Sequence, residues 1–262
     1  MSVLAAPAIG SKPKAASLRA LRRRIWGKPA GSIVKLGGYR VKITDGPNAY
    51  MQYKDVFVHG IYRFASDRPD PLIIDGGGNM GISVLGFRHD HPESRIIAFE
   101  PDPQIFELLR SNLERNDADR NVRLVMSGLG AEEGSAIFEA DGSAGGRVNE
   151  SAGKATVHIE RLSPYLHEPV DFLKLNIEGQ ELPVLRECAA AGALQNVRRM
   201  VVEYHAWAGA PQELGDLLNL LAAQGFRFLV HDFDAETCSI TKPPFKHRPH
   251  AHWFCLVHAQ RP

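Results

Sequence analysis

A carboxylate followed by closely spaced glycines is the strongest chemical signal in this sequence. Asp75 ends an apolar run and is followed by Gly76, Gly78, Asn79 and Gly81. Glycines at such a corner let the backbone approach a bound ligand, because no Cβ stands in the way. The pattern predicts a ligand-binding turn between a strand and a helix.

A second carboxylate completes this predicted site. Glu100 ends the next apolar run, 25 positions after Asp75, where it can accept hydrogen bonds from both hydroxyls of a ribose. Gly76, Gly78 and Gly81 also satisfy the G-x-G-x-x-G fingerprint, so an NAD-dependent oxidoreductase is one interpretation. The charge of Asp75 favours S-adenosylmethionine instead, because that cofactor offers a cationic sulfonium and ammonium where NAD offers an anionic pyrophosphate.

Four more polar residues are expected near this turn. Asn176 and Glu178 follow one apolar run, and Glu203 and His205 end another. Side chains alternate along a strand, so the members of each pair share a side. Polar groups at the mouth of an apolar sheet cost desolvation energy unless they bind something. We therefore expect these four residues to line a reaction site.

The elements that position these residues alternate in type from about residue 71 onward. The expected strands are 72–75, 95–100, 122–126, 172–177, 200–205, 226–231 and 252–258. Helical patterns lie between most of them, and Asp102 followed by Pro103 is a typical helix start. Strands alternating with helices predict an α/β fold, with a mostly parallel sheet that is covered on both faces. The expected sheet has six parallel strands and one antiparallel strand.

Residues 1–67 are expected to form an N-terminal extension to a main domain that spans 68–262. Ten basic residues precede the first acidic one, Asp45. Residues 17–26 have apolar residues on one face of a predicted short helix, and 32–45 predicts a β-hairpin. We expect the short helix to pack on the main domain by its apolar face, with its arginines in solvent. The basic arm is also compatible with contact to an anionic surface, with nucleic-acid binding or with a transit peptide.

The composition is that of an ordinary globular protein. Hydrophobic residues make up 44% and charged residues 23% of the chain, and no run approaches the roughly 18 apolar residues of a membrane-spanning helix. The sequence has three cysteines, an odd number, and none of them has C-x-x-C spacing: Cys188, Cys238 and Cys255. This usage predicts buried thiols in a reducing compartment, and therefore a cytoplasmic location.

Together these motifs resemble those of the FkbM family of S-adenosylmethionine-dependent methyltransferases. The matching segments are IDGGGNMG (74–81), AFEPD (98–102), QIFELLRSN (104–112), LKLNIEGQELPVL (173–185) and VVEYH (201–205). The resemblance implies a seven-stranded Rossmann-like class I methyltransferase sheet. It also implies O-methylation of a hydroxyl on a small molecule, such as a sugar or a secondary metabolite, with S-adenosyl-L-methionine as the cofactor.

The resemblance also assigns roles to residues. The implied cofactor-binding residues are Asp75, Gly76, Gly78, Asn79, Gly81 and Glu100. The family usually has aspartate where this chain has Asn176, and an amide cannot act as a base. We therefore expect Asn176 to orient the cofactor or the substrate. The expected catalytic residues are His205, Glu178 and Glu203, with His205 as the general base and a glutamate orienting it.

Other interpretations of the same residues stay open. His205 can serve structure alone, or Glu178, Glu203 and His205 can hold a divalent ion that polarises the acceptor; the family implies no metal, and none is predicted. A nucleic-acid or protein methyltransferase that uses the basic arm is the alternative function. The sequence at 176–179 reads Asn-Ile-Glu-Gly and lacks the Asn-Pro-Pro-aromatic motif of enzymes that methylate base amines, which counts against a nucleic-acid substrate.

The acceptor pocket is expected to come from segments without motifs. Residues 141–154 are a Gly/Ser-rich interruption that suits either an active-site lid or a disordered insertion. His247, His250 and His252 lie on a connection that is expected on the active-site side. They either rim the acceptor pocket or are ordinary surface histidines.

Overall fold

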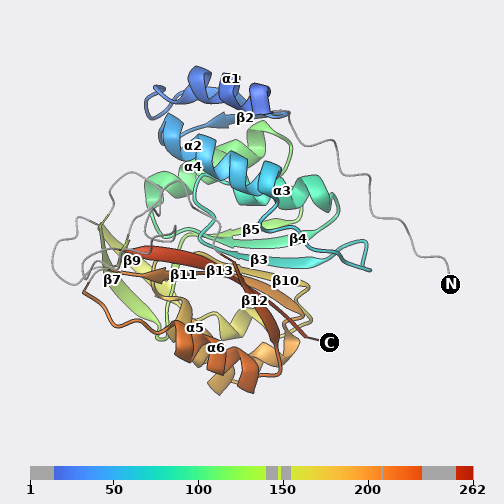
Figure 1. Ribbon diagram of the computed structural model, residues 1–262, viewed down its shortest axis with the longest axis vertical. Helices are drawn as coiled ribbons and strands as arrows, with labels where there is room; N and C mark the ends of the chain where they lie inside the picture. Colours follow the sequence, from blue (N-terminus) through green and yellow to red (C-terminus); the bar gives the residue numbers. More distant parts are fainter. Residues whose placement is uncertain (1–14, 140–146, 149–154, 208, 232–251, 262) are drawn as a thin grey trace.

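A seven-stranded sheet forms the centre of the protein in the computed structural model, which describes residues 15–139, 147–148, 155–207, 209–231 and 252–261 (Figure 1). The strand order is β12-β13-β11-β10-β3-β4-β5. Its members are β3 (Leu72–Gly76), β4 (Arg95–Phe99), β5 (Val122–Val125), β10 (Phe172–Leu175), β11 (Arg199–Ala206), β12 (Arg227–His231) and β13 (Trp253–Gln260).

The strand directions match those predicted from the sequence. β13 pairs antiparallel with both of its neighbours, and every other pair in the sheet is parallel. Six strands therefore run in one direction and one runs against them. The chain passes from β3 outward to β5 and then returns to β10 on the other side of β3, which makes the β3–β10 boundary the switch point where α/β sheets bind ligands.

Helices cover both faces of the sheet (Figure 1). One face carries α3 (Ile82–Asp90) and α4 (Pro103–Arg115), and the other carries α5 (Glu181–Ala190) and α6 (Leu214–Ala223). Short 3-10 helices occur at η2 (Ser163–Tyr165) and η3 (Ala193–Asn196). The predicted start of α4 is confirmed, because Asp102 Oδ1 accepts the backbone N–H groups of Gln104 and Ile105.

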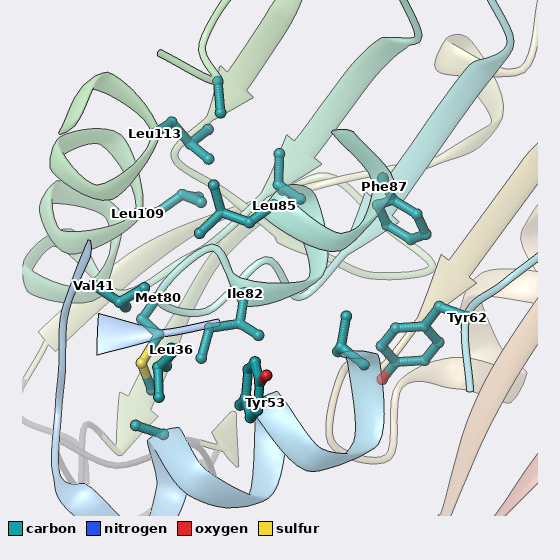
Figure 2. Close-up of a cluster of buried hydrophobic side chains, with 14 of the residues drawn as sticks. Leu36, Val41, Tyr53, Tyr62, Met80, Ile82, Leu85, Phe87, Leu109 and Leu113 are labelled. Carbon is teal, nitrogen blue, oxygen red and sulfur yellow. The ribbon is translucent and has the colours of Figure 1, made fainter. Parts of the chain in front are cut away.

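The N-terminal extension contains the predicted helix and hairpin and two further helical segments. Its elements are α1 (Ala15–Ile25), β1 (Ile33–Leu36), β2 (Tyr39–Lys42), α2 (Gly46–Tyr53) and the π-helix η1 (Lys54–His59). The extension packs on α3 and α4 through one shared hydrophobic cluster. Figure 2 shows side chains of both parts together: Leu36, Val41 and Tyr53 from the extension, and Met80, Ile82, Leu109 and Leu113 from the main domain.

A second, smaller sheet was not predicted from the sequence. Its strands are β6 (Gly128–Leu129), β7 (Gly134–Glu139), β8 (Arg147–Val148) and β9 (Ala155–Glu160), in the order β6-β9-β7-β8. Its hydrophobic support is small, since the cluster of its own has two buried members among the described residues, Val157 and Ile159, and Leu129 of β6 packs with the main core. The sequence therefore carries little apolar periodicity there. The proposed lid at 141–154 lies outside the described residues, apart from β8.

Two further sequence predictions can be compared with the described chain. Cys188 and Cys255 are buried, as expected, while Cys238 lies outside the described residues. No helix in the described segments is long and apolar enough to cross a membrane.

Candidate active site

The glycine turn at the end of β3 is packed tightly by the protein itself. The backbone N–H groups of Gly77 and Gly78 donate to the carbonyl oxygen of Phe99, at 3.1 and 2.8 Å. Gly77 has φ +85°, and a Cβ there would lie 2.0 Å from the carbonyl oxygen of Asn176. Glycine is required because the turn between β3 and α3 touches the chain that leaves β10.

Asp75 stabilises this turn through buried contacts with Lys174 and Ser83. Its Oδ1 lies 2.7 Å from Lys174 Nζ, and its Oδ2 accepts a hydrogen bond from Ser83 Oγ at 2.5 Å. Lys174 Nζ also donates to the carbonyl oxygens of Gly76 and Gly77, at 3.2 and 2.6 Å. Both carboxylate oxygens of Asp75 are thus engaged inside the protein. The expectation that its charge faces the ligand directly does not match this arrangement.

Lys174 is a site residue that the sequence interpretation missed. It lies in the middle of β10, where every residue is buried. A lysine inside an apolar strand is itself a signal, because burying its charge is costly unless a carboxylate pairs with it.

Glu100 follows β4 and binds the backbone of the turn from the β4 side. Its Oε2 accepts the backbone N–H of Asn79 at 2.9 Å, and its Oε1 accepts that of Asp102 at 3.0 Å. Burial raises the pKa of Glu100 to about 7. Asn79 has φ +47°, and its Oδ1 accepts a hydrogen bond from Gln52 Nε2 of the extension at 3.0 Å.

The second predicted group of residues comes together at the ends of β10 and β11. Asn176 Nδ2 donates to Glu203 Oε2 at 3.0 Å, and the Tyr62 hydroxyl donates to the same oxygen at 3.3 Å. Glu203 is buried, and this burial raises its pKa. Tyr62 was not predicted as a site residue, because it belongs to the extension and lies far from Glu203 in sequence.

His205 is surrounded by three carboxylates. Its Nδ1 lies 3.0 Å from Glu181 Oε1, while its Nε2 lies 3.6 Å from Glu178 Oε2 and 3.8 Å from Glu203 Oε1. Burial acts to lower the pKa of His205, but the hydrogen bond with Glu181 and the three negative charges outweigh it and raise the pKa to about 9. An imidazolium is therefore the form expected at neutral pH.

Glu181 is a second residue that the sequence interpretation missed. It is buried at the start of α5, and its carboxylate also accepts the backbone N–H groups of Ile177 and Gly179. These bonds hold a turn in which Glu178 has φ +56°, an uncommon conformation for a residue with a side chain. The sequence carries a partial signal, since acidic residues are favoured in the first turn of a helix.

Aromatic rings border the histidine. The Trp207 ring stacks on His205 with centroids 5.6 Å apart and an interplanar angle of 8°. The ring of His252 lies 5.8 Å from Trp207, so one of the three C-terminal histidines is close to the site. His247 and His250 lie outside the described residues.

The two groups occupy the carboxyl ends of four adjacent strands. β4, β3, β10 and β11 are neighbours in the sheet, so the glycine turn with Glu100 lies beside the cluster of Asn176, Glu178, Glu203 and His205. Among the residues that the structure describes, no three His, Cys, Asp or Glu side chains form a group that could hold a metal ion. The arrangement suits a nucleoside-type ligand next to a polar, carboxylate-rich reaction site.

The seven-stranded sheet, with its one antiparallel strand, is that of a class I methyltransferase. The model of the family described as the methyltransferase FkbM domain matches residues 75–228, which is more than half of the chain. The chain therefore belongs to the FkbM methyltransferase family, and it is a methyltransferase.

Curated relatives are similar at modest identity. Methyltransferase sdnD of Sordaria araneosa is 29% identical over 51% of this chain and 66% of that protein. The hexuronic acid methyltransferase AglP of Haloferax volcanii is 27% identical over 57% of this chain and 62% of that protein. The 31-O-demethyl-FK506 methyltransferase FkbM of Streptomyces tacrolimicus is 25% identical over 72% of this chain and 86% of that protein. The first two alignments span just under two thirds of the relatives' own length.

Proposed function

We propose that this protein transfers a methyl group from S-adenosyl-L-methionine to a hydroxyl of a small molecule, such as a sugar or a secondary metabolite. The observation that carries the proposal is that the glycine turn, which Glu100 binds on its β4 side, adjoins the chain that leaves β10 toward Glu178, with Glu203 and His205 on the next strand. The names of two relatives add support, because one is called a hexuronic acid methyltransferase and the other acts on an O-demethyl compound.

The residues around Glu100 fit the ribose of this cofactor. Each carboxylate oxygen of Glu100 accepts one backbone N–H, and a carboxylate oxygen has two lone-pair positions. One position on each oxygen therefore remains for a ribose hydroxyl. Asp75 contributes indirectly, since it holds Lys174 under the carbonyl oxygens of Gly76 and Gly77.

When bound, S-adenosyl-L-methionine supplies a methyl group that its sulfonium has already activated. The protein must then align the acceptor hydroxyl and remove its proton. Alignment of two reactants contributes about 7–11 kcal/mol in favourable cases, and a positioned base adds roughly 10²–10⁴-fold. Nε2 of His205 faces Glu178 and Glu203 at 3.6 and 3.8 Å, distances too long for direct hydrogen bonds. An acceptor hydroxyl can therefore enter between His205 and either glutamate.

The pKa values change which residue we expect to act as the general base. With a pKa of about 9, His205 already carries its proton at neutral pH and cannot take another. Glu203 is therefore the proton acceptor in our proposal, since burial raises its pKa and makes it a stronger base than an ordinary glutamate. His205 orients the Glu203 and Glu178 carboxylates, and the proton of the acceptor hydroxyl ends on Glu203.

A transfer assay tests the proposal. The full chain is incubated with methyl-labelled S-adenosyl-L-methionine and panels of sugars, polyketide-like alcohols and RNA, with Glu203→Gln as the matched inactive variant. We expect a labelled methyl ether on a small molecule, formed by the wild type only. Label on RNA alone would reject the small-molecule acceptor. Calorimetry that detects binding of NAD, but no binding of S-adenosylmethionine or of its demethylated product, would reject S-adenosylmethionine as the cofactor.

A further inference from the structure

We propose that Tyr62 and Asn176 act together as positioning residues that fix the carboxylate of Glu203, so that one oxygen is anchored and the other faces the reaction site. The inference rests on the proposed function, because it assigns the means by which the reactive carboxylate is held. Neither residue is assigned this task by the family resemblance, and Tyr62 precedes residue 75, where the family match begins.

The two oxygens of Glu203 have different surroundings. Oε2 receives two hydrogen bonds, from the Tyr62 hydroxyl at 3.3 Å and from Asn176 Nδ2 at 3.0 Å. Oε1 lies 3.8 Å from His205 Nε2. Hydrogen bonds are directional, so two donors on Oε2 fix the rotation of the whole carboxylate group. This leaves Oε1 directed toward His205 and available to accept a proton.

Tyr62 keeps its hydroxyl proton at neutral pH and can donate it to Glu203. Burial and the charge of Glu203 raise its pKa well above the ordinary value. Its ring is held in place by packing, with the ring of Phe87 6.2 Å away and Lys174 Nζ 5.5 Å from its centroid. Figure 2 shows Tyr62 beside Phe87 at the edge of the shared cluster. The extension thus contributes a fixed donor to the reaction site.

The amide of Asn176 explains how this chain differs from its family pattern. An aspartate at position 176 would place a second carboxylate about 3 Å from Glu203 Oε2, and two carboxylates so close cannot both be ionised. An amide instead donates a hydrogen bond that favours the ionised form of Glu203. Asn176 and Tyr62 therefore keep the carboxylate both oriented and deprotonated.

The central test compares Tyr62→Phe with Tyr53→Phe. Both tyrosines belong to the extension and are buried to a similar degree, at 7% and 8% exposed. The Tyr53 hydroxyl forms no hydrogen bond within the described part of the chain, so its loss is the matched control. Three quantities are measured: the pH profile of kcat/KM, the affinity for S-adenosylhomocysteine, and the pKa of Glu203 by NMR of protein labelled with [¹³Cδ]glutamate.

We expect Tyr62→Phe to raise the pKa of Glu203 and to move the acidic limb of the profile to higher pH. Turnover at neutral pH should fall by roughly 10- to 100-fold, the range for a hydrogen bond to a charged group. Affinity for S-adenosylhomocysteine should change by less than about threefold, because the cofactor side of the site is untouched. Tyr53→Phe should leave all three quantities at wild-type values.

Two variants of Asn176 provide an independent measurement if Tyr62→Phe does not fold. Asn176→Ala removes the second donor and should raise the pKa of Glu203 as well. Asn176→Asp should raise it further, because the two carboxylates must share a proton. The double variant Tyr62→Phe/Asn176→Ala should show non-additive effects, since both residues act on one oxygen.

The outcomes separate this inference from the proposed function. An unchanged Glu203 pKa in both Tyr62→Phe and Asn176→Ala would overturn the inference. A shifted pKa with unchanged turnover would support the positioning role and reject Glu203 as the base. The NMR measurement decides the inference even if no acceptor is methylated.

Discussion

Lys174 Nζ and Asp75 Oδ1 form a buried ion pair at 2.7 Å, with the two side chains 3% and 0% exposed. The pair joins β10 to β3 at the switch point of the sheet. Because Lys174 also binds the carbonyl oxygens of the glycine turn, the pair connects the core of the fold to the cofactor side of the site.

Replacing Lys174 by Met should therefore destabilise the protein strongly. The variant leaves the Asp75 carboxylate buried without its cation, which typically costs about 3–5 kcal/mol. Equilibrium unfolding in urea measures the loss. Arg186→Met is the control, because Arg186 pairs with Asp216 on the surface and such pairs contribute about 0–1 kcal/mol. Adding Asp75→Asn to Lys174→Met should recover part of the lost stability. Equal losses of stability in Lys174→Met and Arg186→Met would contradict the role of the buried pair.

Gly77→Ala should disrupt the junction between the two halves of the site. The added Cβ would overlap the main-chain carbonyl of Asn176 at 2.0 Å, and Gly77 also has φ +85°. Gly192→Ala is the matched control, since Gly192 has φ +66° but nothing within 4 Å of the added Cβ. The control isolates the conformational cost, about 1–2 kcal/mol. We expect Gly77→Ala to lose at least about 2 kcal/mol more in urea unfolding and to lose affinity for S-adenosylhomocysteine.

The residues behind these two predictions also show how much of the site can be predicted from the sequence. The central sheet and the residues at its strand ends follow from apolar runs that alternate with helical patterns. The family motif indicated that Glu100, Glu203 and His205 lie at the same edge of this sheet, where the structure has them. The contacts that set their chemistry were not predictable in the same way. Lys174 and Glu181 act by pairing with Asp75 and His205, which lie on other strands. A pattern at the end of one strand carries no information about these partners.

Tyr62 illustrates the same limit over a longer range. Its hydroxyl reaches Glu203 only because the extension packs on α3 and α4, and no local pattern around residue 62 marks it. The small sheet of β6 to β9 was missed for a related reason, because short strands with few buried residues leave a weak periodicity.

Cofactor affinity should depend on pH through Glu100. Ribose hydroxyls donate to the ionised carboxylate, so binding favours the deprotonated form. With a pKa of about 7, Glu100 becomes protonated as the pH falls below this value, and the Kd for S-adenosylhomocysteine should rise between pH 7 and pH 5. Calorimetry across this range measures the effect.

Glu100→Gln removes both the charge and the pH dependence. The variant should bind S-adenosylhomocysteine roughly 10- to 100-fold more weakly at pH 8, the range for hydrogen bonds to a charged group, with a Kd that is flat between pH 5 and pH 8. Glu107→Gln on the exposed side of α4 should behave as the wild type. A Glu100→Gln variant that retains the pH slope would assign that slope to another group.

The metal interpretation of Glu178, Glu203 and His205 predicts a dependence on divalent ions, which our proposal does not. We expect methyl transfer to survive exhaustive dialysis against a chelator, because the positive charge beside the two glutamates is supplied by the protonated His205. Turnover is measured before and after dialysis, and again after Mg²⁺ or Zn²⁺ is added back. Activity that disappears on chelation and returns with one ion would replace the imidazolium by a metal as the centre of this cluster.

The pH profile of kcat/KM should be bell-shaped, with each limb assigned to one residue. The acidic limb reflects Glu203, which must be ionised to accept the proton, and burial raises its pKa above the ordinary glutamate value. The alkaline limb reflects His205, whose imidazolium is lost as the pH rises through about 9, so that the glutamates lose the charge that orients them. Glu203→Gln should lower turnover by roughly 10²–10⁴-fold at every pH, whereas His205→Gln should lower it and abolish the alkaline limb. An alkaline limb that persists in His205→Gln would show that a different group titrates there. A single rising limb with a midpoint near 9 in the wild type would return the role of base to the neutral form of His205.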